Sequence, residues 1–301
     1  MRVNPNLLPS ILSDLQQTSS ALNIALQEVS TGKRVQVPSD DPAASANMVQ
    51  NTIDTKNVDQ YTKNVSSVLS MVQTADSTLG TVVSSLTRAI SLGVQGANGT
   101  TNSTNQQSIA TEVQGILDNV VSSANTSYQG TYLFGGTVTS TAPYTADSTS
   151  ASGYKYNGND GVNSVAVGDN LSVQTNLPGS QIFSNSSSDV LGSLSDLVSA
   201  LKSGDSTAIQ TATNSITSAL NYVSQQRVFY GNAETQLNSQ ETYLQQETVS
   251  LTSQQTSLIG IDTATAATDL AKAQTANSAA LAAAAKAMPT TLLNYLSPST
   301  G

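Results

Sequence analysis

Side chains able to carry out chemistry are few in this chain of 301 residues. It has no Cys and no His, which excludes thiolate and imidazole metal sites, cysteine nucleophiles and histidine-based triads. No G-x-S-x-G, G-x-G-x-x-G or Walker A run is present. The pair Gly32-Lys33 lacks the preceding glycine and the following Ser/Thr of a phosphate loop. Carboxylates remain, but no catalytic pair stands out, so the sequence predicts no enzymatic activity and no cofactor.

One segment carries side chains of the type that bind cations. The run Asn157-Gly158-Asn159-Asp160-Gly161 resembles a calcium loop but lacks the downstream bidentate glutamate. Asn-Gly and Asp-Gly pairs strongly favour tight turns between strands. We therefore favour a β-turn over a calcium loop, and the sequence predicts no metal site.

Charge and hydropathy narrow the classes of partner. The formal net charge is −9, and the eleven basic residues are scattered without forming a patch, which argues against nucleic-acid binding. No run of 18 apolar residues is present, so no membrane span is predicted. The N-terminus lacks the charged and apolar regions of a cleaved Sec signal peptide.

The elements that position these residues follow from two seven-residue repeats. The downstream repeat consists of Ile209, Ile216, Val223, Tyr230, Leu237, Leu244, Leu251 and Leu258. The upstream repeat consists of Val58, Val65, Val72, Leu79 and Leu86, with companions three residues later at Tyr61, Val68, Ala75, Val82 and Ala89. Apolar residues at this spacing keep one seam of a helix facing a partner helix. Because the downstream companions include Gln226, Gln240 and Gln254, we expect that seam to be narrow and partly polar.

Glycine, proline and aspartate mark the expected ends of the helices. We expect helices over 11–29, from Pro42 to about Leu92, 104–128, 189–201, 205–258 and 263–288. Gly32 and the Gly93/Gly96/Gly99 cluster are expected to end helices, and Asp41, Asp205 and Asp262 to act as N-caps. Between about residues 131 and 184, β-forming residues alternate with Gly-containing turns.

These elements predict a mainly α fold, a long antiparallel coiled-coil rod formed by the N- and C-terminal segments with a small β-rich insert. We expect five segments. Residues 1–42 and 261–301 form a terminal helical domain, 43–136 and 187–260 form the rod, and 137–186 form the insert.

Both terminal helices carry an apolar stripe that has no obvious partner in a compact core. One interpretation is a two-helix hairpin that extends the rod; the other is that both ends order only within an assembly. Under the second interpretation the candidate interface residues are Ile11, Leu15, Leu22, Leu26, Val29, Leu270, Leu281, Leu292, Leu293, Tyr295 and Leu296.

The run Ser30 to Ala44, with Gly32-Lys33-Arg34-Val35 and Asp40-Asp41-Pro42-Ala43-Ala44, resembles the spoke segment of the flagellin superfamily. Asn125 to Gly136, Arg227 to Asn238, and Leu292-Leu293-Asn294-Tyr295-Leu296 resemble other stretches of that superfamily. The proline at position 42, directly after the two aspartates, resembles the pattern of the hook–filament junction branch of that superfamily. The segment Arg227 to Ala233 and the proline at 289 depart from the expected pattern, which affects the packing of the tail.

The resemblance implies a structural protein that joins hook to filament, with a flagellin-type filament subunit as the alternative. It implies self-association into a ring or helical layer, with another hook-associated protein on the hook side and flagellin on the filament side. It also implies export without a cleaved signal, a chaperone during export, and an extracellular location in the flagellum. A zinc peptidase on a flagellin-like scaffold is excluded, because its His-Glu-x-x-His helix needs histidine.

The glycine and proline breaks predict the pattern of limited proteolysis. The isolated chain should resist chymotrypsin only between about residue 45 and residue 260, because weakly amphipathic helices lie outside the breaks. Mass spectrometry of the resistant fragment measures this. Early cleavage in the central rod with intact ends would contradict the prediction.

Overall fold

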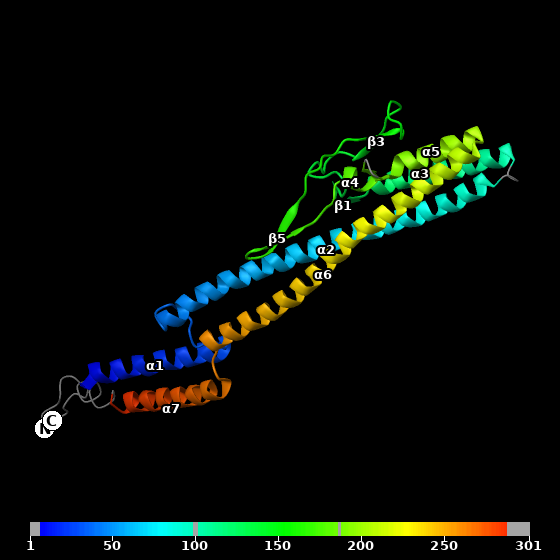
Figure 1. Ribbon diagram of the computed structural model, residues 1–301. Helices are drawn as coiled ribbons and strands as arrows, with labels where there is room; N and C mark the ends of the chain where they lie inside the picture. The colour runs from blue at the N-terminus through cyan, green and yellow to red at the C-terminus, as the bar shows by residue number, and fades with distance from the viewer. Residues whose placement is uncertain (1–6, 99–101, 186–187, 288–301) are drawn as a thin grey trace, which may run out of the picture. The chain divides into compact units, whose positions relative to one another are not determined.

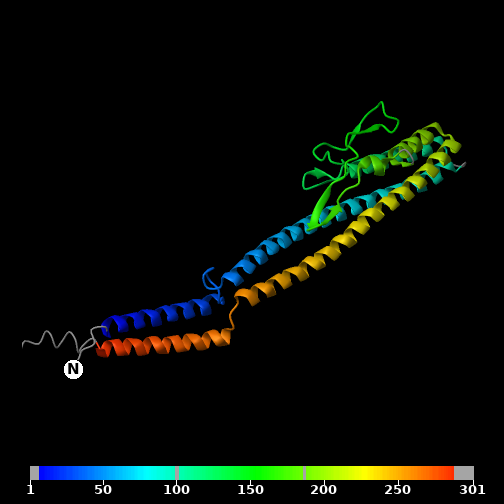
Figure 2. The same ribbon diagram turned by 60° about the vertical axis from the view of Figure 1, so that its left-hand side comes forward.

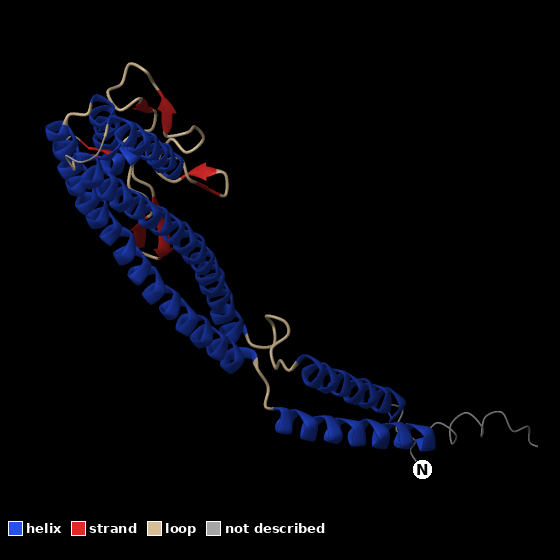
Figure 3. Cartoon of the chain, turned by 90° about the vertical axis from the view of Figure 1, so that its right-hand side faces the viewer, coloured by secondary structure: helices blue, strands red, loops and turns tan. Residues whose placement is uncertain are grey.

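A computed structural model describes residues 7–98, 102–185 and 188–287. Helices make up most of this part of the chain (Figure 3). They are α1 (Leu7–Thr31), α2 (Pro42–Ala97), α3 (Ser103–Ala124), α4 (Gly179–Phe183), α5 (Val190–Ser203), α6 (Ser206–Ile259) and α7 (Thr263–Ala287). None of the described helices combines the length and the hydropathy needed to cross a bilayer.

The strands form four separate antiparallel pairs between α3 and α5. These are β1 (Ser127–Tyr128) with β2 (Thr131–Tyr132), β3 (Tyr144–Ala146) with β4 (Tyr154–Tyr156), β5 (Ser164–Gly168) with β6 (Leu171–Gln174), and β7 (Ser184–Asn185) with β8 (Ser188–Asp189). The predicted mainly α fold with a small β-rich insert is confirmed.

The chain divides into two compact units. One contains Met1–Lys56 and Glu247–Gly301, and the other contains Asn57–Gln246. The division of the sequence into five segments stays a prediction.

In the unit Asn57–Gln246 the core lies along the seam between α2 and α6, which run beside each other (Figure 2). Every upstream repeat position is buried, and of the companions only Tyr61 stays partly exposed. The downstream repeat is buried from Ile209 to Leu251, and Leu258 is partly exposed. Gln226 and Gln240 are partly exposed and Gln254 is exposed. The predicted seam, narrow and partly polar at the companion positions, is confirmed.

The expected caps are present. Gly32 has φ +67° and its N–H bonds to the Glu28 carbonyl at 2.8 Å, which ends α1. Asp41 Oδ1 accepts from Ala44 N at 3.0 Å, directly before Pro42 opens α2. Asp205 caps α6 through Thr207 N at 2.9 Å, and Asp262 caps α7 through Ala264 N at 2.9 Å.

The predicted end of α2 near Leu92 is wrong, because the helix continues through Gly93 and Gly96 to Ala97. A Cβ on Gly93 would lie 2.3 Å from Thr213 Oγ1, and one on Gly96 would lie 2.3 Å from Leu201 Cδ2. Real Cβ atoms do not approach that closely. These two glycines therefore allow neighbouring elements to pack closely and do not break the helix.

The predicted extension of the next helix to Tyr128 is also wrong, because α3 ends at Ala124. The side chain of Asn125 makes two hydrogen bonds to the backbone of Tyr144, both at 2.8 Å. Asn125 Nδ2 donates to Tyr144 O, and Tyr144 N donates to Asn125 Oδ1. This pairing turns the chain into the insert four residues earlier than the apolar pattern indicates.

The insert is attached to the long helices by hydrogen bonds from side chains. Tyr230 of α6 is buried, its hydroxyl accepts from Leu177 N at 3.2 Å, and burial raises its pKa. Gln240 Nε2 donates to Val167 O at 2.9 Å, and Asn64 Nδ2 donates to Ala166 O at 2.8 Å. The β5–β6 hairpin is therefore held by one side chain from each long helix, and the donor from α6 is a polar companion position of the seam.

The segment 157–161 joins β4 to β5, which belong to different sheets, as irregular, bent backbone. Asn159 Oδ1 accepts from Thr137 N at 2.8 Å and from Gly161 N at 3.1 Å. The preference for a β-turn over a calcium loop stays a prediction.

The buried seam generates a stability prediction. Leu244→Asp should lower the free energy of unfolding by about 3 kcal/mol or more, because a charge without a partner enters an apolar contact. Gln246→Asp, at an exposed position two residues away, is the control and should change it by less than about 0.5 kcal/mol. Urea denaturation of both variants measures the difference, and equal losses would contradict the assigned seam.

Candidate assembly interface

The terminal helices α1 and α7 pack side by side as a hairpin within one unit (Figures 1 and 2). From α1 the contact uses positions spaced by three and four residues, Ile11, Leu15, Thr18, Leu22 and Ala25. From α7 it uses Ala266, Leu270, Ala273, Asn277, Ala280 and Ala284, all buried or partly buried. Alanine fills four of the six α7 positions, so each buries little apolar area and the hairpin gains little stability from hydrophobic contact.

The candidate residues divide between the two faces of this hairpin. Ile11, Leu15, Leu22 and Leu270 are partly buried along the α1–α7 contact. Leu26, Val29 and Leu281 remain exposed, at 45%, 44% and 51%. Leu292, Leu293, Tyr295 and Leu296 lie outside the described residues. The hairpin itself therefore accounts for only the first four.

Sequence reasoning missed two exposed apolar residues of α1. Leu12 is 61% exposed and Ile24 is 56% exposed, and both lie off the three-and-four spacing of the seam. The sequence could have revealed both residues, because each is aliphatic but lies out of phase with the apolar stripe of α1. A helix with aliphatic side chains on its solvent side indicates a surface that another chain covers.

A groove of about 690 Å³ runs beside the two helices. Leu12, Leu15 and Leu281 supply its apolar wall, and the rest is lined by Gln16, Ser19, Ser20, Asn23 and Asn277. Its lining carries no charge. The α1 helix contains only Asp14 and Glu28 as charged residues, so this surface suits apolar and neutral polar partners.

The connector between α1 and α2 is tied to the end of α6. Arg34 N donates to Ile259 O at 2.7 Å, and Ile261 N donates to Gly32 O at 3.2 Å. The Arg34 guanidinium contacts the Asp41 carboxylate at 3.1 Å and Leu258 O at 3.3 Å. The Ala44 N–H and the Arg34 guanidinium hold the pKa of Asp41 below its usual value.

A small apolar cluster supports the same connector. Val35, Ala44 and Ile259 are buried together, and Met48 and Leu258 pack against them. The Asp40 carboxylate accepts from Gln36 N and Val37 N, both at 3.0 Å. The connector is thus a folded element with its own contacts.

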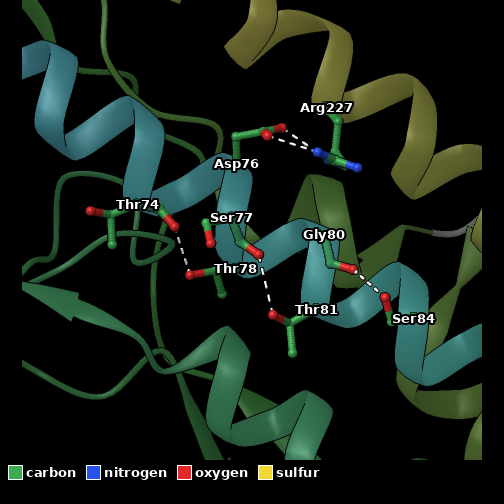
Figure 4. A network of polar contacts seen from close by, with 8 residues as sticks. All are labelled: Thr74, Asp76, Ser77, Thr78, Gly80, Thr81, Ser84 and Arg227. Atoms are coloured by element: carbon green, nitrogen blue, oxygen red, sulfur yellow. Dashed lines mark hydrogen bonds and ion pairs between the residues drawn. The ribbon is translucent and has the colours of Figure 1, made fainter.

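A bidentate ion pair links α2 and α6 in the other unit (Figure 4). Arg227 Nε and Nη2 lie 2.9 and 2.7 Å from the two Asp76 oxygens, and this bond raises the pKa of Arg227. The hydroxyls of Thr78, Thr81 and Ser84 bond to carbonyls four residues earlier, as Figure 4 also shows. These hydroxyl groups of α2 are therefore satisfied within their own helix, without a charged partner. Sequence reasoning missed Asp76, although it directly follows the seam position Ala75.

Two family models match the chain. The bacterial flagellin N-terminal helical region matches residues 4–139, and the bacterial flagellin C-terminal helical region matches residues 213–296. Together they cover most of the sequence and correspond to the two halves of one family. The chain belongs to the flagellin family.

Individual members of the flagellin family align with part of this chain. Flagellar hook-associated protein 3 of Escherichia coli (strain K12) is 37% identical over 123 residues, 40% of this chain and 38% of that protein. A flagellin of Salmonella muenchen is 30% identical over 119 residues, 39% of this chain and 24% of that protein. The aligned part thus spans well under half of the length of either relative.

Solved structures share the fold of this flagellin-family chain. A flagellar hook-associated protein 3 from Legionella pneumophila superposes with a TM-score of 0.63 at 15% identity, covering 69% of this chain and 98% of that one. The two family models leave residues 140–212 unmatched, which includes β3 to β8, α4 and α5. The flagellin-type similarity therefore lies in the long helices, the terminal hairpin and the connector.

The Arg34 contacts generate a prediction about the connector. Arg34→Ala should speed hydrogen exchange at the amides of residue 34 and Ile261 by about two- to five-fold, because it removes the ion pair with Asp41 and the hydrogen bond to Leu258 O. Lys33→Ala, which removes the neighbouring cation and leaves these contacts in place, is the control. Hydrogen exchange of both variants is measured by mass spectrometry. Identical exchange rates in the two variants would show that Arg34 does not hold the connector.

Proposed function

We propose that this chain is a structural component of the bacterial flagellum that joins the hook to the filament. The observation that carries the proposal is its similarity, at 37% identity, to proteins named flagellar hook-associated protein 3 in Escherichia coli and Salmonella typhimurium. The matched flagellin is 30% identical over a stretch of similar length. The role is mechanical, and no residue acts as a catalyst.

The surface used for assembly is the α1–α7 hairpin. Leu12, Ile24, Leu26 and Leu281 are exposed there although they are aliphatic, and a cover supplied by neighbouring copies would remove them from water. Repeated contacts of one surface with a different surface on the next copy close into a ring or a helical layer. The closing residues Leu292, Leu293, Tyr295 and Leu296 add apolar area to the same interface.

Two different partners follow for the two ends of such a layer. Another hook-associated protein lies on the hook side and flagellin lies on the filament side. The chain reaches this place outside the cell by export without a cleaved signal peptide, with a chaperone that covers its apolar helices before assembly. Nucleic acid, membrane, metal and cofactor have no part in this role.

A flagellin-type filament subunit is the second candidate, favoured by membership of the flagellin family. The two differ in the number of copies. Quantitative mass spectrometry of purified flagella should find this chain in a small, fixed number of copies per flagellum; thousands of copies would identify the filament subunit.

Removal of the closing apolar segment tests the junction role. Deleting Leu292–Leu296 should leave a folded, exported chain that does not hold a filament, because each buried side chain contributes about 1.5–3 kcal/mol only when neighbouring copies cover it. Cells that lack the intact gene and express the truncated chain should shed flagellin into the medium and carry bare hooks. Deleting the polar residues 297–301 is the control and should leave filaments attached. Normal filaments on cells with the first deletion would refute the assembly role of the tail.

A further inference from the structure

The apolar seam of α2 and α6 does not by itself fix how the helices align. Both partners repeat every seven residues, with Val or Leu at each upstream repeat position and Ile, Val, Tyr or Leu at each downstream one. A slip of seven residues, about 10 Å along the axis, would again place apolar side chains against apolar side chains. Some other contact must therefore exclude the slipped alignments.

The Asp76–Arg227 pair distinguishes one alignment from its neighbours. A slip of one heptad moves Arg227 from Asp76 to the level of Leu69 or Val83. The same slip leaves Asp76 at the level of Leu220 or Glu234. A charge would then face an aliphatic side chain, or a carboxylate would face a carboxylate. Either arrangement desolvates a charge without the bidentate partner it has now, at 2.7 and 2.9 Å.

Neighbouring residues make the pair specific to this level. Gly80 lies beside the Arg227 guanidinium, where an added Cβ would be in ordinary contact at 3.7 Å; one heptad away α2 carries the longer Gln73 or Thr87. Gln73 Nε2 donates to Glu234 Oε1 at 3.0 Å, one heptad along α6 from Arg227. In one direction of slip, Leu86 would also take the place of Gly93 against Thr213.

The insert depends on the same alignment. Tyr230 lies three residues from Arg227, and its hydroxyl accepts from Leu177 N. Gln240 from α6 and Asn64 from α2 hold adjacent carbonyls, those of Val167 and Ala166, of the β5–β6 hairpin. One hairpin can be held by both helices only when the two helices keep their present alignment.

We propose that the Asp76–Arg227 ion pair is the register determinant of the α2–α6 coiled coil. The pair adds little to net stability, because both side chains are about a third exposed and water screens their attraction. Its role is to make the slipped alignments unfavourable and so to keep both anchors of the insert at one level. This role does not depend on the proposed function.

The absence of cysteine allows a direct measurement of the register. Ser84 and Ser239 are exposed and lie on opposite sides of the Asp76–Arg227 pair along the seam. Cysteines at these two positions carry nitroxide labels, and double electron–electron resonance on the full chain gives the distribution of distances between them. A one-heptad slip changes that distance by about 10 Å.

The variant Asp76→Leu/Arg227→Leu should remain helical and show a second distance population displaced by about 10 Å. The reversed pair, Asp76→Arg/Arg227→Asp, should keep the single distance of the parent chain. The control is Arg88→Leu/Glu112→Leu, which removes an exposed ion pair of 2.7 Å between α2 and α3 and should also keep a single distance.

One unchanged distance for the leucine pair would overturn the proposal, as would a second population in the Arg88/Glu112 control. Should the leucine pair fail to fold, Asp76→Asn/Arg227→Gln keeps polar side chains at both positions and decides the question by the same measurement. Two populations there support the register role, and a single parental distance refutes it.

Discussion

Packing along the seam between α2 and α6 is the constraint on which the Asn57–Gln246 unit depends. The two helices are separated in the chain by more than a hundred residues, so their contact brings distant segments together and closes the unit around the insert. The seam is narrow because its companion positions on α6 include Gln226 and Gln240. A narrow seam gives less hydrophobic stabilisation, and it leaves donors free to hold other elements. Gln240 is the clearest case, since its amide binds a carbonyl of the insert.

Low charge shapes the surfaces outside the seam. Only 10% of the residues are charged, and many hydroxyls on α2 bond to carbonyls of their own helix. Such a surface is polar enough for water but has few groups that hold water or ions strongly. Another chain can cover it with little desolvation cost, which suits the assembly role proposed above. Ion pairs are few in the part of the chain that the structure describes, and Asp76–Arg227 is the one proposed here to position two helices.

The terminal hairpin gains little stability from its own packing and is joined to a well-defined connector. Alanine dominates the α7 side of the hairpin, so the free energy gained by packing α1 on α7 is small, while aliphatic side chains remain on the outside. The connector joins this hairpin to the ends of α2 and α6 through the hydrogen bonds of Arg34 and the cluster of Val35, Ala44 and Ile259. In the proposed assembly, neighbouring copies would contact a hairpin whose connector already has a defined structure.

Local signals in the sequence determined the helices, their caps and the buried seam. Asp41, Asp205 and Asp262 act within one turn of their own position, and a heptad repeat needs only the periodicity of its own helix. For the same reason Ile11, Leu15, Leu22, Leu26 and Val29 were predicted on one face of α1, of which the first three are partly buried and the last two are exposed. Leu12 and Ile24 were not, because they are out of phase with that face.

Only the tertiary structure decided what depends on residues far apart in the chain. Gly93 and Gly96 look like helix breakers locally, yet Thr213 and Leu201 approach them so closely that glycine is required inside the helix. Asn125 ends α3 because Tyr144 offers its backbone, and Asp76 meets Arg227 across 151 positions. The pattern of one segment shows which side chains its helix can bury. The alignment of two helices depends on pairs of residues that match in shape or charge, and the two members of each pair lie in different segments.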